Sequence, residues 1–495
     1  MMNAYHSLTE RFKRLSRLEH LSAIAGWDMQ TMMPSGGSQA RGEALAELSV
    51  MHHEILTQSS TGEWLDRAAQ ESLDDDQRAN LTEMQRHYTD AALLPAELVE
   101  AKALAGSRCE QAWRQQRIDN DWHGFKQNLK PVVELSRQEA KLRAAVQGST
   151  PYDALLNLYE PGMTSEQLDT LFGDLTQWLP ELLQQVVASQ PPLPALPATR
   201  IFPISQQKAL AETVMQLLDF DVTQGRLDVS AHPFCGGVPS DVRITTRYDS
   251  AEFLSALMGV IHETGHARYE QNLPKHWAGQ PIGLARSTAI HESQSLFMEM
   301  QLGRSQPFLQ RIHPLICQHL TAANALSLND LVRQVQHVSP GLIRVDADEV
   351  SYPAHIILRY EIERSLINGE VEVEDIPELW DDKMQRYLGL STAGNYRDGC
   401  MQDIHWTDGS FGYFPTYTLG AMYAAQLFNA MQTQLPKVHE AIKIGDFTPV
   451  FQWLNDNIWC HGSRYPVNTL IRQATGEILN PRWFKQHLQH RYLGR

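Results

Sequence analysis

The chain has 495 residues, enough for a large buried core and, on length alone, for two or three domains. Its 42 Lys and Arg against 58 Asp and Glu give a formal net charge of -16, which disfavours nucleic acid or an anionic membrane as a partner. The 5 cysteines are scattered without a C-x-x-C pair, and no apolar stretch is long enough to span a membrane, so we expect a cytoplasmic protein without a disulfide framework.

Most of the chain is predicted to be helical. Apolar residues at helical spacing predict helices over residues 4–26, 39–57, 75–93, 96–116 and 122–147. The proline-rich stretch 190–197 interrupts this pattern and predicts a link between two lobes of one domain (1–495), an N-terminal helical lobe (1–197) and a catalytic lobe (198–495). Residues 241–248 alternate between β-branched and polar side chains and predict a short strand.

The pentapeptide His262-Glu263-Thr264-Gly265-His266 is the strongest functional signal. Two histidines four residues apart lie on one helix face, so both imidazoles can reach one metal ion. The glutamate between them is offset around the helix and can act on a water molecule instead of binding the ion. This H-E-x-x-H pattern predicts zinc-assisted hydrolysis, most often of a peptide bond.

The residues before the pentapeptide predict that it lies on a buried helix. Asp249 or Ser250 can cap the helix start, and residues 249–252 match a capping box that ends in Glu252. The apolar residues that follow at helical spacing are Phe253, Leu254, Leu257, Val260 and Ile261. Buried histidines need polar partners, and a metal ion supplies one.

A catalytic zinc needs a third protein ligand. The extended pattern H-E-x-x-H-x-x-G-x-x-H is excluded, because Tyr269 and Asn272 occupy its glycine and histidine positions. Glu270 is also excluded, because His262, His266 and Glu270 would extend along about 12 Å of helix axis. The third ligand must therefore come from another segment.

A second helix downstream offers that ligand. Ser287 or Thr288 can cap its start, and Glu292 follows within its first turns. Two histidines and a glutamate one helix downstream form the ligand set of thermolysin-like enzymes. Glu299 on the same predicted helix is the competing candidate.

Six motifs in a fixed order extend the signal over nearly the whole chain. They are HPF at 232–234, DVRIT at 241–245, HETGH at 262–266, HESQ at 291–294, IRVDAD at 343–348 and GCMQDIHW at 399–406, after an opening WD at 27–28 and MP at 33–34. With these motifs the chain resembles the carboxypeptidase Taq family of zinc metallocarboxypeptidases.

The resemblance implies a mainly α fold in which two helical lobes surround a deep active-site groove, with a small antiparallel β-sheet beside the zinc helix, as in neurolysin-like peptidases. It implies a homodimer with one zinc ion per chain, which cobalt can replace. The implied activity is the release of C-terminal amino acids from peptides with a free C-terminus, with broad preference and poor action on C-terminal proline. A zinc dipeptidase or oligopeptidase on the same scaffold is the alternative, and a binding protein that lacks turnover is a third reading.

The implied chemistry assigns roles to specific residues. His262, His266 and Glu292 would hold zinc, and Glu263 would accept the proton of the attacking water and pass it to the leaving amine. Recognition of a free α-carboxylate favours arginine, whose planar fork matches a carboxylate. The candidates for this substrate clamp are Arg243 and Arg344, which lie inside two of the motifs.

Several assignments stay open at this stage. Composition alone makes two roles equally compatible with Arg344, an ion pair with neighbouring acids and a substrate clamp, and the resemblance favours the clamp. We expect Asp241, Asp346 and Asp348 to be partners of the two arginines. The oxyanion of the intermediate needs a further donor, for which His405 and either Tyr413 or Tyr417 are available, although packed core aromatics are the alternative for the tyrosines. His232 either lines the groove or holds the loop before the strand.

Overall fold

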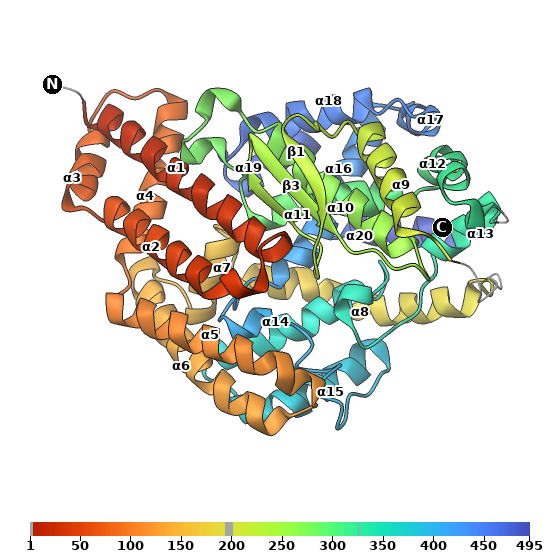
Figure 1. The fold of residues 1–495 in the computed structure, drawn as a ribbon, viewed down its shortest axis with the longest axis horizontal. Helices are drawn as coiled ribbons and strands as arrows, with labels where there is room; N and C mark the ends of the chain where they lie inside the picture. The colour runs from red at the N-terminus through yellow and green to blue at the C-terminus, as the bar shows by residue number, and fades with distance from the viewer. Residues whose placement is uncertain (1–2, 194–200, 325) are drawn as a thin grey trace. The chain divides into compact units, whose positions relative to one another are not determined.

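Helices make up most of the computed structural model, which describes residues 3–193, 201–324 and 326–495 (Figure 1). The prediction of a mainly α-helical fold is confirmed. Within the described residues, no helix combines the length and the apolar character that crossing a membrane requires. Part of the proline-rich stretch, 194–197, lies outside the described residues, and the division into lobes at residue 197 stays a prediction.

The chain forms two compact units, which we describe separately. The first unit comprises Met1–Ala92, Leu193–Val335 and Tyr423–Leu479, and the second comprises Leu93–Pro192, Gln336–Met422 and Asn480–Arg495. The helices of the first unit are α1 (Ala4–Thr31), α2 (Ser38–Leu56), α3 (Ser59–Ala68), α4 (Asp75–Ala92), α9 (Ile204–Leu217), α10 (Leu254–Gln271), α11 (Thr288–Leu296), the π-helix η4 (Phe297–Gly303), α12 (Gln306–His319), α13 (Leu328–Val335), α17 (Val438–Ile444), α18 (Thr448–Asn457) and α19 (Val467–Thr475).

The second unit is built from helices alone within the described residues. They are α5 (Ala96–Ile118), α6 (Trp122–Gln147), α7 (Pro151–Tyr159), α8 (Ser165–Ser189), α14 (Tyr352–Asn368), α15 (Ile376–Leu388) and α20 (Arg482–Leu493), and α16 (Pro415–Gln434) begins in this unit and ends in the first. The five helical ranges predicted from periodicity correspond to α1, α2, α4, α5 and α6. The prediction for 122–147 matches α6 at both ends.

The first unit contains a small mixed sheet in the order β1-β3-β2. The strands are β1 (Gly225–Val229), β2 (Cys235–Val238) and β3 (Asp241–Thr246). The expected antiparallel pairing holds for β2 and β3, because only two residues join them and so short a connection reverses the chain. β1 instead pairs with β3 in parallel, with Gly225 opposite Val242.

The sheet supports the helix that carries the H-E-x-x-H motif. In the view of Figure 1, α10 and α11 lie behind β1 and β3. Val242 and Ile244 of β3 are 1% and 0% exposed and belong to one core cluster with Val260 and Ala267 of α10. Each such buried aliphatic side chain contributes about 1.5–3 kcal/mol. The sheet therefore fixes α10 along the length that carries the motif.

The predicted cap of α10 is wrong. The helix begins at Leu254, and Asp249 accepts a hydrogen bond from the backbone N–H of Ala251 instead of capping the helix. Asp249 and Glu252 form an isolated β-bridge, which holds residues 249–252 outside the helix. The N-cap residue is Phe253, which makes no side-chain cap hydrogen bond, and the Glu252 carboxylate before it accepts the N–H of Ser255.

Candidate active site

The motif helix α10 and the following helix α11 pack closely at Gly265. A Cβ atom on Gly265 would lie 2.4 Å from the carbonyl oxygen of Gln294 and 2.6 Å from the Cα of Ser295, so only glycine allows the two backbones this approach. Ser287 caps α11 as predicted, because its side chain accepts from the N–H of Ile290. These contacts bring Glu292 of α11 to the face of α10 that carries the two histidines.

His262, His266 and Glu292 form a cluster that could hold a metal ion. One ligand atom from each lies within 4.8 Å of the others. The Nε2 atom of His266 is 3.3 Å from Glu292 Oε2, and that of His262 is 4.0 Å from the same oxygen. Ligands of a tetrahedral zinc ion lie roughly 3.4 Å apart, so small side-chain adjustments would suffice. Two imidazole nitrogens and one carboxylate oxygen also suit zinc better than Mg²⁺ or Ca²⁺.

Glu299, the competing candidate for the third ligand, contacts a different atom of the cluster. Its Oε2 lies 3.0 Å from Nδ1 of His262, and its Oε1 accepts from Arg304 at 2.8 Å. A carboxylate on Nδ1 fixes the orientation of the ring and leaves Nε2 for a metal ion. Glu299 lies in the π-helix η4, and single π-helical turns occur often at functional sites.

Glu263 lies beside the cluster and is 6% exposed. Burial raises the pKa of its carboxyl to about 7, and the nearby Glu292 contributes in the same direction. Within the described residues, its Oε2 has no hydrogen-bond partner. Such a carboxylate can exchange a proton near neutral pH, as a general base must.

Arg243 and His232 also lie in the first unit. Arg243 forms a two-point ion pair with Asp241, at 2.9 and 2.7 Å, which confirms that expected partnership. Its guanidinium also lies over the ring of Trp27, 4.6 Å from the ring centre. His232 is exposed, and its carbonyl accepts from Ser230 Oγ at 2.5 Å in the loop before β2.

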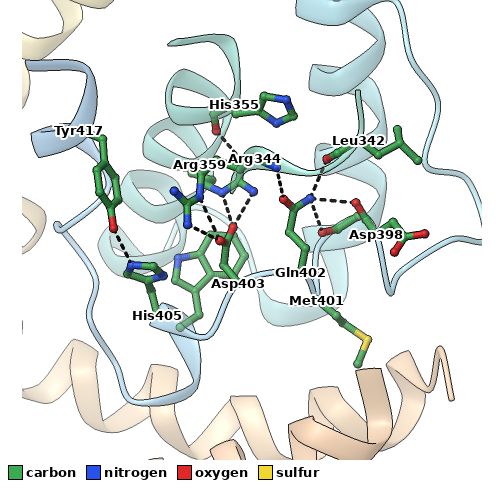
Figure 2. A network of polar contacts seen from close by, with 12 residues as sticks. Leu342, Arg344, His355, Arg359, Asp398, Met401, Gln402, Asp403, His405 and Tyr417 are labelled. Carbon is green, nitrogen blue, oxygen red and sulfur yellow. Dashed lines mark hydrogen bonds and ion pairs between the residues drawn. The ribbon is translucent and has the colours of Figure 1, made fainter. Parts of the chain in front are cut away.

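Arg344 lies in the second unit, in a network of polar contacts shown in Figure 2. Its Nε and Nη2 donate to Asp403 Oδ1 at 3.0 and 2.8 Å, and its Nη1 donates to Tyr352 at 3.0 Å. The expected pairing with Asp348 is wrong, because Asp348 accepts from the backbone and side chain of Ser351. Asp403 comes from the last of the six motifs, so folding joins two motifs here.

The same network contains a second arginine. Arg359 Nε donates to Asp403 Oδ2 at 2.7 Å, so two guanidiniums share one half-buried carboxylate and leave an excess of one positive charge. Glu363 is a buried acid nearby, but it does not pair with these arginines. Its carboxylate accepts hydrogen bonds from Trp406, Tyr152 and the backbone N–H of Gly412. Burial raises the pKa of Glu363 to about 7, so it compensates the excess charge only in part.

His405 and the two candidate tyrosines also lie in this second unit. Figure 2 shows the contact between His405 and the Tyr417 hydroxyl. The Nε2–hydroxyl distance is 3.2 Å, and the Tyr417 ring centre is 5.0 Å from the guanidinium of Arg344. Tyr413 packs its ring against Tyr159, 5.1 Å between centres, and against His405, 5.3 Å between centres. Burial, with Arg344 nearby, lowers the pKa of His405 to about 4, so its imidazole is neutral at pH 7. The structure thus groups His405 and Tyr417 with Arg344.

Sequence reasoning did not select three residues that shape these sites. They are Gly265, Asp403 and Arg359. A glycine inside a buried helix signals a close approach, and this would have indicated Gly265. Asp403 lies inside a quoted motif but contacts its arginines only after folding, and Arg359 lies in none of the quoted motifs.

An H-E-x-x-H helix backed by a small sheet, with a glutamate from the next helix, defines the class of metal-dependent peptidases. Residues 7–492 match the family model of carboxypeptidase Taq (M32) metallopeptidase. The chain is 39% identical to thermostable carboxypeptidase 1 of Thermus thermophilus, over 99% of this chain and 98% of that one. It is 38% identical to carboxypeptidase 1 of Bacillus subtilis, over 98% and 97%.

Solved structures agree with this match. Trypanosoma cruzi metallocarboxypeptidase 1 superposes with a TM-score of 0.96 at 46% identity, over 99% of both chains. The M32 carboxypeptidase from Deinococcus radiodurans R1 superposes with a TM-score of 0.95 at 31% identity, over 99% of this chain and 98% of that one. The chain belongs to the carboxypeptidase Taq (M32) metallopeptidase family. It is a peptide hydrolase of the carboxypeptidase type that works with a metal ion.

Proposed function

We propose that the metal is zinc, held by His262, His266 and Glu292, and that the enzyme removes amino acids one at a time from peptides with a free C-terminus. When bound, zinc activates water and polarises the scissile carbonyl. Glu263 takes the proton of the attacking water and passes it to the leaving amine. Arg344 binds the α-carboxylate of the substrate.

The observation that carries the carboxypeptidase assignment is the hydrogen bonding of the Arg344 guanidinium, two of whose N–H donors are not used by Asp403 or Tyr352. Of the five N–H donors of a guanidinium, three are used by Asp403 and Tyr352, which leaves one on each terminal nitrogen. Two parallel donors match the two oxygens of a carboxylate. The excess positive charge around Asp403 favours the same anion, because buried charges need compensation.

His405 and Tyr417 are proposed to donate hydrogen bonds to the oxyanion, since they lie beside Arg344 and the neutral imidazole carries an N–H. Tyr413 also packs on His405 and stays a candidate; the hydrogen bond between His405 and the Tyr417 hydroxyl favours Tyr417. Arg243 stays a second candidate for the clamp; its ion pair with Asp241 uses two of its five N–H donors, and its guanidinium lies over the ring of Trp27. His232 stays a candidate for the groove, since its side chain is exposed.

The test is C-terminal laddering followed by mass spectrometry, with one unblocked peptide and its C-terminal amide. We expect stepwise loss from the free acid only. Glu263→Gln should retain the metal and lose turnover, whereas Glu292→Gln should lose both. Arg344→Ala should raise KM for the free acid by roughly tenfold to a hundredfold, as expected for a lost charge-assisted hydrogen bond, and Arg243→Ala serves as its matched comparison.

Other outcomes would contradict the proposal. Internal cleavage of both peptides would establish a zinc oligopeptidase, and cleavage of dipeptides alone a dipeptidase. Metal retention without cleavage of any peptide would indicate a binding protein. An Arg344→Ala variant with unchanged KM for the free acid would remove the clamp.

The family resemblance supports further properties that we also propose. These are a broad preference for the C-terminal residue of the peptide with poor action on proline, replacement of zinc by cobalt, a cytoplasmic location and a homodimer. A peptide set that varies only in its last residue tests the preference. Reconstitution with each metal and sedimentation analysis test the metal and the dimer.

A further inference from the structure

We propose that the C-terminal helix α20 positions the substrate clamp, acting through the buried carboxylate of Glu349. This inference rests on the proposed function, in which Arg344 binds the α-carboxylate of the peptide. None of the six motifs includes α20, and Glu349 directly follows the motif that contains Arg344. All of these residues lie in the second unit.

Three side chains of α20 converge on Glu349. Its Oε1 is 2.5 Å from Nε2 of His487, and its Oε2 accepts from Arg491 at 2.9 Å and from the Tyr492 hydroxyl at 2.8 Å. The Glu349 side chain is 0% exposed and that of Arg491 is 9% exposed. Because burial of a carboxylate is costly unless it is paired, this set of donors holds Glu349 at one position.

The turn between Arg344 and Glu349 has no buried side chain to fix it. The residues from Val345 to Asp348 are exposed or half-buried, and Val345 is 69% exposed. Apolar packing therefore does not determine where the turn lies. Its position depends on the polar anchors at its two ends and on the Asp348 carboxylate, which accepts the N–H groups of Ser339 and Ser351.

Those two anchors bracket Arg344 and its partner. At one end, the N–H of Arg344 donates to Gln402 at 2.7 Å, which Figure 2 shows, and its side chain bonds Asp403. At the other end, Glu349 is tied to α20 just before Tyr352, whose hydroxyl accepts from Arg344 Nη1. Loss of the contacts between Glu349 and α20 would remove the anchor at this end of the turn and leave the contacts of Asp348 to hold it.

The clamp is sensitive to such loosening. A guanidinium that binds a carboxylate at two points needs the correct plane as well as the correct distance. A shift of the turn would misalign the two remaining N–H donors while leaving the metal ligands in the first unit unchanged. The effect should therefore fall on discrimination between a free acid and its amide, and not on metal binding.

The experiment measures peptide binding without turnover, in full-length zinc-loaded protein that carries Glu263→Gln. Calorimetry gives the Kd of an unblocked peptide and of its C-terminal amide, and the ratio of the two reports the clamp. Arg491→Met should reduce this ratio on the order of three- to tenfold, less than the loss of a direct charge-assisted hydrogen bond because Arg491 acts through Glu349. Tyr492→Phe, which removes one hydroxyl and is the milder change, should reduce it about twofold to threefold.

Arg495→Met is the matched control, because Arg495 is exposed just beyond the same helix. It should leave the ratio unchanged, and all variants should keep their zinc. An unchanged ratio in both Arg491→Met and Tyr492→Phe, with Arg344→Ala abolishing it, would overturn the role of α20 and leave the clamp standing. No preference for the free acid even without these changes would overturn the clamp itself, and the inference with it.

Discussion

At the residue scale, the proposed metal site depends on side chains outside its expected ligands. Gly265 lets the backbone of α11 approach α10, which places Glu292 against both imidazoles. Glu299 holds the other nitrogen of His262 at 3.0 Å and is itself held by Arg304. Such partners typically change metal affinity by about 10–100-fold when they are lost. The ligand triad therefore extends into a larger supported cluster.

Gly265→Ala should weaken metal binding although it replaces glycine inside a helix. On propensity alone the change would stabilise α10 by about 1 kcal/mol. The new Cβ would instead meet the backbone of Gln294 at 2.4 Å, so α11 must move and Glu292 with it. Competition with a zinc indicator should show at least about a tenfold loss of affinity.

Gly259→Ala is the matched control on the same helix. The nearest atom to its new Cβ is Thr246 Oγ1 at 4.0 Å, so nothing has to shift. It should keep the metal affinity and be neutral or stabilising. Equal zinc affinities for the two variants would contradict the close-approach argument.

At the element scale, α14 carries several of the groups in the polar network around Arg344. Arg359 on this helix shares Asp403 with Arg344, and Tyr352 at its start accepts from Arg344. His355, one turn after Tyr352, is 0% exposed. Burial, reinforced by Arg359 and Arg344, lowers the pKa of His355 to about 3. The helix therefore places a neutral histidine beside two cations.

His355→Gln should make stability less dependent on pH. Between pH 6.5 and about 3, the unfolded chain binds a proton at His355 that the folded chain does not. The stabilisation is fully present above pH 6.5 and is lost as the pH falls toward 3. From pH 7 to pH 5, the unchanged protein should lose about 2 kcal/mol more of its free energy of unfolding than the variant.

Urea titrations at the two pH values give this difference. His123→Gln, at an exposed position on α6, is the control and should follow the unchanged protein. A His355→Gln variant with the same loss as the unchanged protein would show that His355 does not remain neutral in the fold.

At the scale of the whole molecule, the proposed metal would link two successive α-helices of the first unit. Its expected ligands come from α10 and α11 of the first unit, and Glu292 and Glu263 are only 7% and 6% exposed. A ligand that binds only the folded chain stabilises it by about 4 kcal/mol at a thousandfold excess over its Kd. Metal removal should therefore have a structural effect as well as a catalytic one.

Chelation should lower the melting temperature and increase hydrogen exchange in α10 and α11, with α6 and α20 of the second unit unaffected. Calorimetry with exchange mass spectrometry measures both effects, and added zinc should reverse them. Glu292→Gln is the control, because it should already melt low and show little response to a chelator. An unchanged melting temperature after verified metal removal would exclude a structural role for the metal.

The sequence alone predicted the features that depend on local pattern. Helical spacing located α6 at both ends, and the H-E-x-x-H spacing placed His262 and His266 on one face of a buried helix. The Ser287 cap was predicted because capping depends on a few neighbouring residues. The cap of α10 was predicted wrongly, because a β-bridge between Asp249 and Glu252 overrode the local signal.

Only the tertiary structure decided which groups meet across long separations in the chain. It paired Glu299 with Nδ1 of His262, joined Arg344 to Asp403 instead of to the acids of its own motif, and brought α20 to Glu349. Helical periodicity states which face of an element is buried but not which element covers it. Contacts between distant residues arise from packing, and so the partners of the clamp became visible only in the folded chain.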